Sequence, residues 1–250
     1  MLYNAGDCNI SFKIYGKSGR PLLFLHGNGE DHLVFKNQIE YFQNIYKVIA
    51  VDTRGHGKSG RGTKPLDFDT ISNDIIGLIK EGGAEKPDIV GFSDGANIAM
   101  HIAMKEPDLI GKLVLIGGNI SPDGMKGGTR FNLKLCCAFW AFIKVFNKKA
   151  ISRIEKLDLM LKHPKLSFSD LKKIKSKTLV IAGSKDVVKD AHTREIAANI
   201  KGSHLKIVNG DHFAPLKRHT ETNNLILGFL INKKSAVSGA EPVANFQKIV

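Results

Sequence analysis

The sequence is poor in cysteine, with three among 250 residues, two of which are the neighbours Cys136 and Cys137. Adjacent cysteines do not build a disulfide framework, so we expect a reducing compartment, the cytoplasm. No run approaches the roughly 20 apolar residues that cross a bilayer. The N-terminal stretch lacks the basic flank and apolar run of a secretory signal. These absences argue against a disulfide-rich, secreted or membrane-spanning protein.

Acidic residues are scarce relative to basic ones. The chain has 24 Asp and Glu against 37 Lys and Arg, a formal net charge of +13, and residues 120–176 hold 13 of the basic but only 4 of the acidic residues. Such a surplus suits nucleic acid, anionic lipid or anionic substrates. No nucleic-acid-binding motif accompanies it, so we expect no nucleic-acid partner. We interpret the basic segment as a solvated helical surface that could also favour anionic substrates or membrane surfaces.

What the sequence does contain is a regular alternation of apolar runs with helix-length segments. Several runs are solidly apolar (LLFL, LVLI, TLVIA), as in strands that are covered on both faces. The expected strands are residues 10–15, 22–25, 47–51, 88–91, 112–116, 178–182 and 204–208. The expected helices are residues 33–43, 70–81, 96–105, 192–199 and 215–231. This βαβα order predicts an α/β fold with a mostly parallel sheet and helices on both faces.

Two segments depart from that alternation. Residues 120–175 are basic and helical in pattern, so we expect a small helical cap inserted into a core formed by residues 1–119 and 176–232. Its aromatic residues should face a pocket or pack on the core: Phe131, Phe139, Trp140, Phe142 and Phe146. Residues 233–250 lose periodicity and predict a loosely held tail. The short link between residues 10–15 and 22–25 predicts an antiparallel hairpin at one edge of the sheet.

The motif Gly91-Phe92-Ser93-Asp94-Gly95 is G-x-S-x-G. It follows an apolar strand and opens a helical run, which is the setting of a nucleophile elbow. There the serine backbone is strained so that its hydroxyl projects from the sheet, and the small residues Gly91 and Gly95 let strand and helix approach. Ser93 is therefore the candidate nucleophile.

A serine hydroxyl needs a base, and the base needs an acid that orients it. Asp186 follows the expected strand at 178–182, and His212 follows the one at 204–208. Both lie at carboxyl ends of strands, where loops of an open α/β sheet converge. The order Ser93, Asp186, His212 predicts a catalytic triad.

Three other acids compete with Asp186. Asp190 precedes a helix and is expected to be its N-cap. Asp211 adjoins His212 in sequence, where side chains diverge. Asp123, beyond the expected strand at 112–116, remains a further alternative.

The turn His26-Gly27-Asn28-Gly29 follows an apolar strand. It is placed to present a backbone N–H to the pocket. We expect the N–H groups of Asn28 and Asp94 to form an oxyanion hole, and His26 to be a structural, hydrogen-bonded histidine.

Two glycine patterns imitate nucleotide-binding motifs. Residues 55–60 match G-x-G-x-x-G, but they do not open a helix directly, as a dinucleotide fingerprint requires. Gly57-Lys58-Ser59 resembles the end of a Walker A loop, yet Asp52 stands where its first glycine belongs. No Cys/His spacing indicates zinc, and His212 with His219 is not a metal pair. We expect neither a cofactor nor a metal.

Taken in order, the motifs FLHGNG, DTRGHGKSG, GFSDGA, AGSKD and GDHF resemble those of the α/β-hydrolase fold superfamily, over about residues 10–231. The resemblance implies Ser93 as nucleophile, Asp186 as acid and His212 as base. It also implies that residues 52–60 form a structural loop that Arg54 and His56 hold in shape, and that the cap is that of the esterase and lipase-like branch.

The sequence after the serine, SDG and then IGGNISPDGM, is similar to that of valacyclovirase-like hydrolases. In those enzymes the acidic residue after the nucleophile is implicated in holding a substrate amino group, which implies this role for Asp94. The alternative is that Asp94 hydrogen-bonds to groups nearby.

The expected function is cleavage of a carboxylic ester of a small or medium substrate through an acyl-enzyme intermediate. Alternatives are hydrolysis of another acyl bond (aminoacyl ester, amide, thioester or C–C) and a non-catalytic protein of the same fold that binds a small molecule. The sequence leaves the acyl and alcohol preference and the oligomeric state open.

Overall fold

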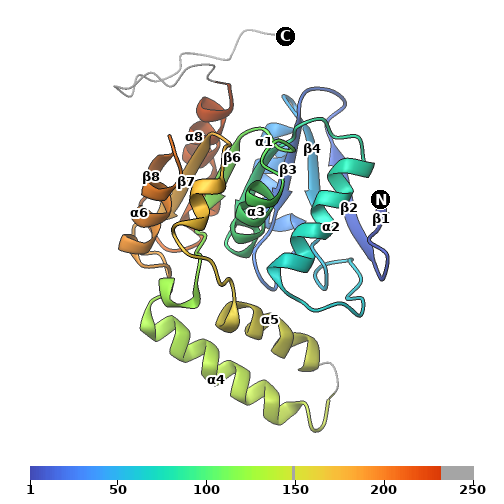
Figure 1. Cartoon of the computed structure of the whole chain (residues 1–250), viewed down its shortest axis with the longest axis vertical. Helices are drawn as coiled ribbons and strands as arrows, with labels where there is room; N and C mark the ends of the chain where they lie inside the picture. Colours follow the sequence, from blue (N-terminus) through green and yellow to red (C-terminus); the bar gives the residue numbers. More distant parts are fainter. Residues whose placement is uncertain (148–149, 232–250) are drawn as a thin grey trace.

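The computed structural model describes residues 1–147 and 150–231, so the expected tail at 233–250 lies outside the described residues. Eight strands form one sheet in the order β1-β2-β4-β3-β5-β6-β7-β8 (Figure 1). The strands are β1 (Leu2–Asn4), β2 (Asn9–Tyr15), β3 (Pro21–Leu25), β4 (Lys47–Val51), β5 (Asp88–Phe92), β6 (Leu113–Ile116), β7 (Thr178–Gly183) and β8 (His204–Val208). Strands β4, β3, β5, β6, β7 and β8 are parallel, which confirms the predicted α/β sheet.

Helices cover both faces of this sheet, with two further helices beyond one end of it (Figure 1). The α-helices are α1 (Lys36–Phe42), α2 (Phe68–Glu81), α3 (Asp94–Lys105), α4 (Gly127–Ile143), α5 (Ala150–Lys162), α6 (Asp190–Asn199), α7 (Ala214–Lys217) and α8 (His219–Ile231). Short 3₁₀ turns are η1 (His32–Phe35), η2 (Pro122–Gly124) and η3 (Asp170–Lys173). No α-helix within the described ranges has the length and apolar character that crossing a bilayer requires.

Apolar side chains of the parallel strands divide between two cores. Along β3, Leu23 and Leu25 pack with α2, α3 and α6, whereas Leu22 and Phe24 pack with α1 and α8. Successive side chains of a strand point to opposite faces, so a strand between two helical layers must be apolar at every position. This requirement explains why the runs LLFL, LVLI and TLVIA could be recognised as central strands.

The predicted hairpin between residues 10–15 and 22–25 is wrong. Strand β2 pairs antiparallel with β4, and β3 lies on the other side of β4, between β4 and β5. The fully buried β3 takes an interior position, where both of its edges are hydrogen-bonded. The link passes close to the turn before β4: Gly16 and Gly19 have φ values of 81° and 100°, and a side chain at Gly19 would collide with the Ile45 carbonyl.

Other elements also differ from the expectation. The helix expected at 215–231 is divided into α7 and α8 at Arg218, whose ψ of 51° is not helical. The expected helix at 33–43 begins as the 3₁₀ turn η1. Strand β1 was not expected, because three residues carry no readable period; it pairs antiparallel with β2.

The segment between β6 and β7 carries α4 and α5, which lie beyond the sheet (Figure 1). The side chains of Phe131, Phe139, Phe142 and Phe146 are exposed, so the expectation that they face a pocket or pack on the core is wrong. Trp140 is half-buried, and its ring lies 4.3 Å from the Arg153 guanidinium.

Candidate active site

Ser93 lies at the sharp turn between β5 and α3. Its φ of 53° and ψ of −118° are strained for a residue with a side chain. The Ser93 N–H donates to the Ile116 carbonyl at 2.7 Å, which ties the turn to β6. A Cβ on Gly91 would lie 2.3 Å from the Gly95 carbonyl oxygen, and one on Gly95 would lie 1.9 Å from that of Leu25. The glycines are therefore required for the close strand–helix approach that the motif predicts.

Asp186 and His212 come from neighbouring loops, after β7 and β8, and their side chains meet. His212 Nδ1 lies 2.7 Å from Asp186 Oδ1. Burial alone would raise the pKa of Asp186, but hydrogen bonds from His212 and from the Val188 and Gly183 N–H groups outweigh it and hold the pKa below its ordinary value. A carboxylate that stays ionised beside an imidazole can orient it and stabilise its protonated form.

Ser93 and His212 line the same cavity of about 170 Å³. The imidazole packs against the Phe92 ring, with centroids 5.0 Å apart, and a Cβ on Gly117 would lie 2.8 Å from its Cε1. Among the described residues, Ser93 Oγ forms no hydrogen bond to His212. Such bonds are often long without substrate and tighten when it binds.

The Asn28 side chain joins its turn to the start of α3 and to α5 by hydrogen bonds. Asn28 Nδ2 donates to Asp94 Oδ2 at 2.8 Å and to the Lys156 carbonyl in α5 at 2.9 Å. Both Asn28 and Asp94 line the cavity. Their backbone N–H groups donate to no described residue. These two donors are thus available beside Ser93.

Asp94 is buried, and its carboxylate accepts hydrogen bonds from side-chain amides. The partners are Asn28, at 2.8 Å, and Asn97, at 3.3 Å. Burial raises the pKa of Asp94 to about 6, although both amides act in the opposite direction. The neighbours are amide side chains of α3 and of the Asn28 turn, so Asp94 also joins the two elements beside the nucleophile.

Sequence reasoning missed Glu30, which also lines the cavity. Its Oε2 accepts the Gly27 N–H at 3.1 Å, and burial raises the pKa of its carboxyl group to about 6. An acid in a glycine-rich turn normally predicts a solvated side chain. The signal available was its place two residues after Asn28, in the same turn.

Within the described part of the chain, none of the three rival acids is hydrogen-bonded to the His212 imidazole. Asp123 is exposed and pairs with Arg130. Asp211 accepts from the Phe213 N–H and pairs with Lys217. The expectation that Asp190 is the N-cap of α6 is wrong, because Lys189 holds that position. The Asp190 carboxylate instead pairs with Arg194 one turn later.

The loop at residues 52–60 is held by buried polar groups. Arg54 is fully buried and makes two hydrogen bonds each to Asp74 in α2 and Asp7 in the N-terminal loop, at 2.7–2.9 Å. His26 Nε2 accepts the Thr53 N–H at 3.0 Å. Desolvation lowers the pKa of His56 to about 3, which keeps it neutral while its Nδ1 lies 3.0 Å from the Arg54 carbonyl.

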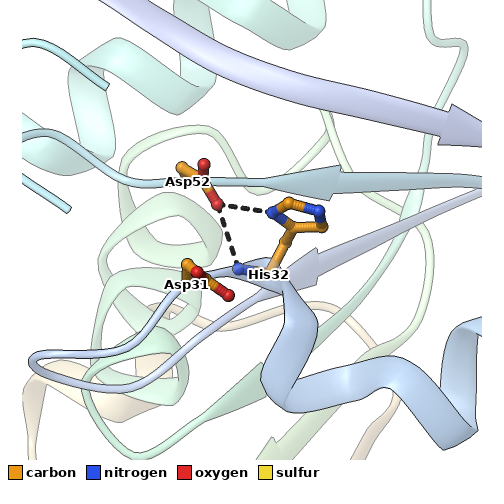
Figure 2. A group of neighbouring side chains, drawn as sticks. All are labelled: Asp31, His32 and Asp52. Atoms are coloured by element: carbon orange, nitrogen blue, oxygen red, sulfur yellow. Dashed lines mark hydrogen bonds and ion pairs between the residues drawn. The ribbon is translucent and has the colours of Figure 1, made fainter. Parts of the chain in front are cut away.

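Asp31, His32 and Asp52 place three metal-ligating atoms within 4.8 Å of one another. Figure 2 shows His32 turned with Nδ1 towards Asp52, at 2.7 Å, while the His32 N–H donates to the same carboxylate oxygen at 3.0 Å. Asp31 accepts the Leu33 N–H, and Asp52 also accepts that of Lys58. These hydrogen bonds give the three residues a structural role, because they join η1 to the loop at residues 52–60.

Comparison with known proteins finds similar chains among the α/β-hydrolases. A family model for the alpha/beta hydrolase fold matches residues 20–131. The sn-1-specific diacylglycerol lipase ABHD11 of Danio rerio is 30% identical over 134 residues, 51% of this chain and 41% of the relative. The AB hydrolase superfamily protein YisY of Bacillus subtilis is 28% identical over 245 residues, 84% of this chain and 91% of the relative.

The enol-lactonase from Burkholderia xenovorans LB400 has a similar structure, with a TM-score of 0.75 and 18% identity over 93% of this chain and 100% of that one. The strand order and the turn at Ser93 thus define an α/β-hydrolase fold. In sequence the chain is similar to members of the α/β-hydrolase superfamily. The match covers 41% of the Danio rerio lipase, and the lipase activity in that name is a property of the relative, not one shown for this chain.

Proposed function

We propose that this chain is a serine hydrolase that cleaves a carboxylic ester of a small or medium substrate. The observation that carries the proposal is the 2.7 Å contact between His212 and Asp186, on the cavity that the strained Ser93 also lines. The proposal is also supported by the names of a relative, a diacylglycerol lipase, and of a protein of similar fold, an enol-lactonase.

In the proposed reaction, Ser93 Oγ attacks the substrate carbonyl carbon while His212 Nε2 accepts the hydroxyl proton. Asp186 holds the imidazole orientation and stabilises the imidazolium. The Asn28 and Asp94 N–H groups donate to the oxyanion. The tetrahedral intermediate collapses, the C–O bond to the alcohol breaks, and His212 protonates the leaving oxygen. Water then loses a proton to His212 and attacks the acyl-enzyme carbonyl carbon. The bond to Ser93 Oγ breaks, His212 returns the proton to Ser93 Oγ, and the acid leaves.

We expect Ser93→Ala and His212→Ala each to reduce turnover of a p-nitrophenyl short-chain ester by roughly 10⁴-fold or more. Neither removal opens the core, so circular dichroism should remain that of the wild type. Ser18→Ala, in an exposed loop, is the matched control and should keep full activity. Retained turnover in either site variant would refute the triad.

Labelling with a fluorophosphonate separates catalysis from mere binding. The wild type should be labelled at Ser93 and the Ser93→Ala variant should not. A protein that only binds a small molecule has no activated serine, so absence of labelling in the wild type would favour that alternative.

A second candidate is a hydrolase whose substrate carries an amino group. Two carboxyl groups, Glu30 and Asp94, line the cavity, and both oxygens of Asp94 already accept amide hydrogen bonds. We therefore infer that Glu30 is the better placed of the two for an ammonium. Aminoacyl and plain acyl esters should be compared in the wild type, Glu30→Gln and Asp94→Asn. Equal rates for both ester classes, unchanged by either substitution, would exclude this candidate.

A further inference from the structure

The outer face of α4 carries an apolar stripe that no described residue covers. Its members follow one another at spacings of four, four, three and four, so they share one helix face. They are Phe131 (61% exposed), Leu135 (53%), Phe139 (57%), Phe142 (66%) and Phe146 (77%), the last just beyond the helix end. A helix normally turns its apolar face to the core. In α4 this apolar face is exposed, and a different face of the helix is half-buried.

The half-buried face of α4 packs on α5. Trp140 lies over Arg153 of α5, and Cys137 Sγ is 3.9 Å from Asp158 Oδ1. On the same side, Thr129 and Leu133 line the catalytic cavity. Figure 1 shows α4 as the outermost element, with α5 between it and the sheet. The aromatic stripe is therefore directed away from the rest of the molecule.

The charge around the stripe has one sign. Among the described residues 126–147, four are basic and none is acidic: Lys126, Arg130, Lys134 and Lys144. Nearby acids of the cap are already paired: Asp123 with Arg130, Glu155 with Arg61 and Asp158 with Lys162. Exposed aromatics flanked by lysine on one helix are typical of helices that lie in a membrane interface.

We propose that the outer face of α4 docks on the surface of an anionic phospholipid bilayer. The phenylalanines would enter the acyl boundary while the lysines meet anionic headgroups. A second copy of the chain fits less well, because two such faces would bring lysines of the same sign together. With 17 residues, α4 would lie on the bilayer rather than cross it.

Docking would hold the cavity within about one helix diameter, roughly 10 Å, of the lipid, because Thr129 and Leu133 on the opposite face of α4 line it. An ester leaving the bilayer would then have a short path to Ser93. That consequence rests on the proposed hydrolase function, whereas the docking itself does not.

The test is co-sedimentation of the full chain with vesicles of phosphatidylcholine alone or with 30% phosphatidylserine. The wild type should bind the anionic vesicles and not the neutral ones, and added salt should weaken binding. Phe139→Asp/Phe142→Asp should reduce binding at least tenfold. The control Ile45→Asp/Ile231→Asp makes the same charge change at exposed apolar positions outside the cap and should stay within about twofold.

Tryptophan fluorescence of the variant Trp140→Phe/Phe142→Trp gives a second readout, since Trp140 is the one tryptophan of the sequence and lies on the half-buried face of α4. Anionic vesicles should shift the emission of this variant to the blue. The Phe139→Asp/Phe142→Asp variant should keep wild-type circular dichroism and full turnover of a soluble ester, so that loss of docking is separated from loss of catalysis or fold.

Several results would overturn the proposal. Vesicle binding that survives Phe139→Asp/Phe142→Asp would do so, as would binding lost only in Lys201→Glu/Lys206→Glu, in a lysine-rich groove beside α8. A wild type that ignores anionic vesicles but dimerises through the stripe in analytical ultracentrifugation would assign this face to a second copy instead.

Discussion

At the scale of single residues, three carboxyl groups near one cavity differ because their neighbours differ. Asp186 receives hydrogen bonds from His212 and two backbone N–H groups, which keep its pKa low despite burial. Glu30 and Asp94 accept fewer hydrogen bonds, so the effect of burial is the larger one and raises the pKa of each to about 6. The first is suited to orient an imidazole, and the other two hold a proton more readily than an ordinary carboxyl group.

Glu30→Gln should stabilise the protein more at pH 7.5 than at pH 4.5. The folded-state pKa of Glu30 lies above its ordinary value, so the folded chain binds the extra proton and loses stability as pH rises from about 4.5 to 6. Glu30→Gln removes this loss. The stability change that the substitution causes should therefore differ by about 1 kcal/mol between the two pH values, after allowance for partial solvation. Urea unfolding at both pH values measures it.

The control is Glu85→Gln, the same substitution at an exposed position. Its stability change should differ between the two pH values by much less. A Glu30→Gln effect equal at pH 4.5 and 7.5 would show that burial does not perturb this carboxyl group.

At the scale of elements, the junction of β5 with α3 depends on the absence of side chains. Gly95 lies in the first turn of α3, where its Cα faces the carbonyl oxygens of Leu25 and His26. Because backbone atoms of β3 cannot move aside without breaking ladder bonds, helix and strand could not keep this separation with any larger residue.

Gly95→Ala should destabilise the protein by about 3 kcal/mol or more, since the added Cβ would lie 1.9 Å from a backbone oxygen. Gly128→Ala is the matched control: this glycine is also helical, and nothing lies within 4 Å of its Cβ position. It should be neutral or stabilise by about 0.5–1 kcal/mol. Equal melting temperatures for the two variants would contradict the close approach.

At the scale of the whole molecule, two polar contacts join α5 to loops of the α/β part of the chain. Arg61, in the loop before α2, forms a two-pronged pair with Glu155 of α5, at 2.9 and 2.7 Å. Beside it, Asn28 donates to the Lys156 carbonyl. Asn28 lines the cavity, so this second contact links the position of α5 to the cavity shape.

Glu155→Gln should leave global stability within about 1 kcal/mol, because the pair is partly solvated. Amide hydrogen exchange in α5 should nonetheless become faster, since local opening of the cap loses one of its restraints. The control is Glu106→Gln, which breaks a comparable surface pair with Lys80 in the α/β part of the chain, away from α5. Unchanged exchange in α5 would show that the Arg61–Glu155 pair does not hold the cap.

Much of the fold followed from local pattern. Strands covered on both faces are apolar at every position, and the loops at their carboxyl ends converge, so Ser93, Asp186 and His212 could be named before their surroundings were known. The roles of these residues remain a prediction, although the three side chains line or adjoin one cavity.

Local pattern was enough to specify the elements that burial makes apolar and the glycines that close backbone contact requires. Contacts between distant segments were needed to establish that β4 separates β2 from β3, that Glu30 faces the cavity, and that the phenylalanines of α4 point outward. The reason is physical: periodicity tells which face of an element is apolar, but hydrogen bonds and packing between distant segments decide what, if anything, covers that face.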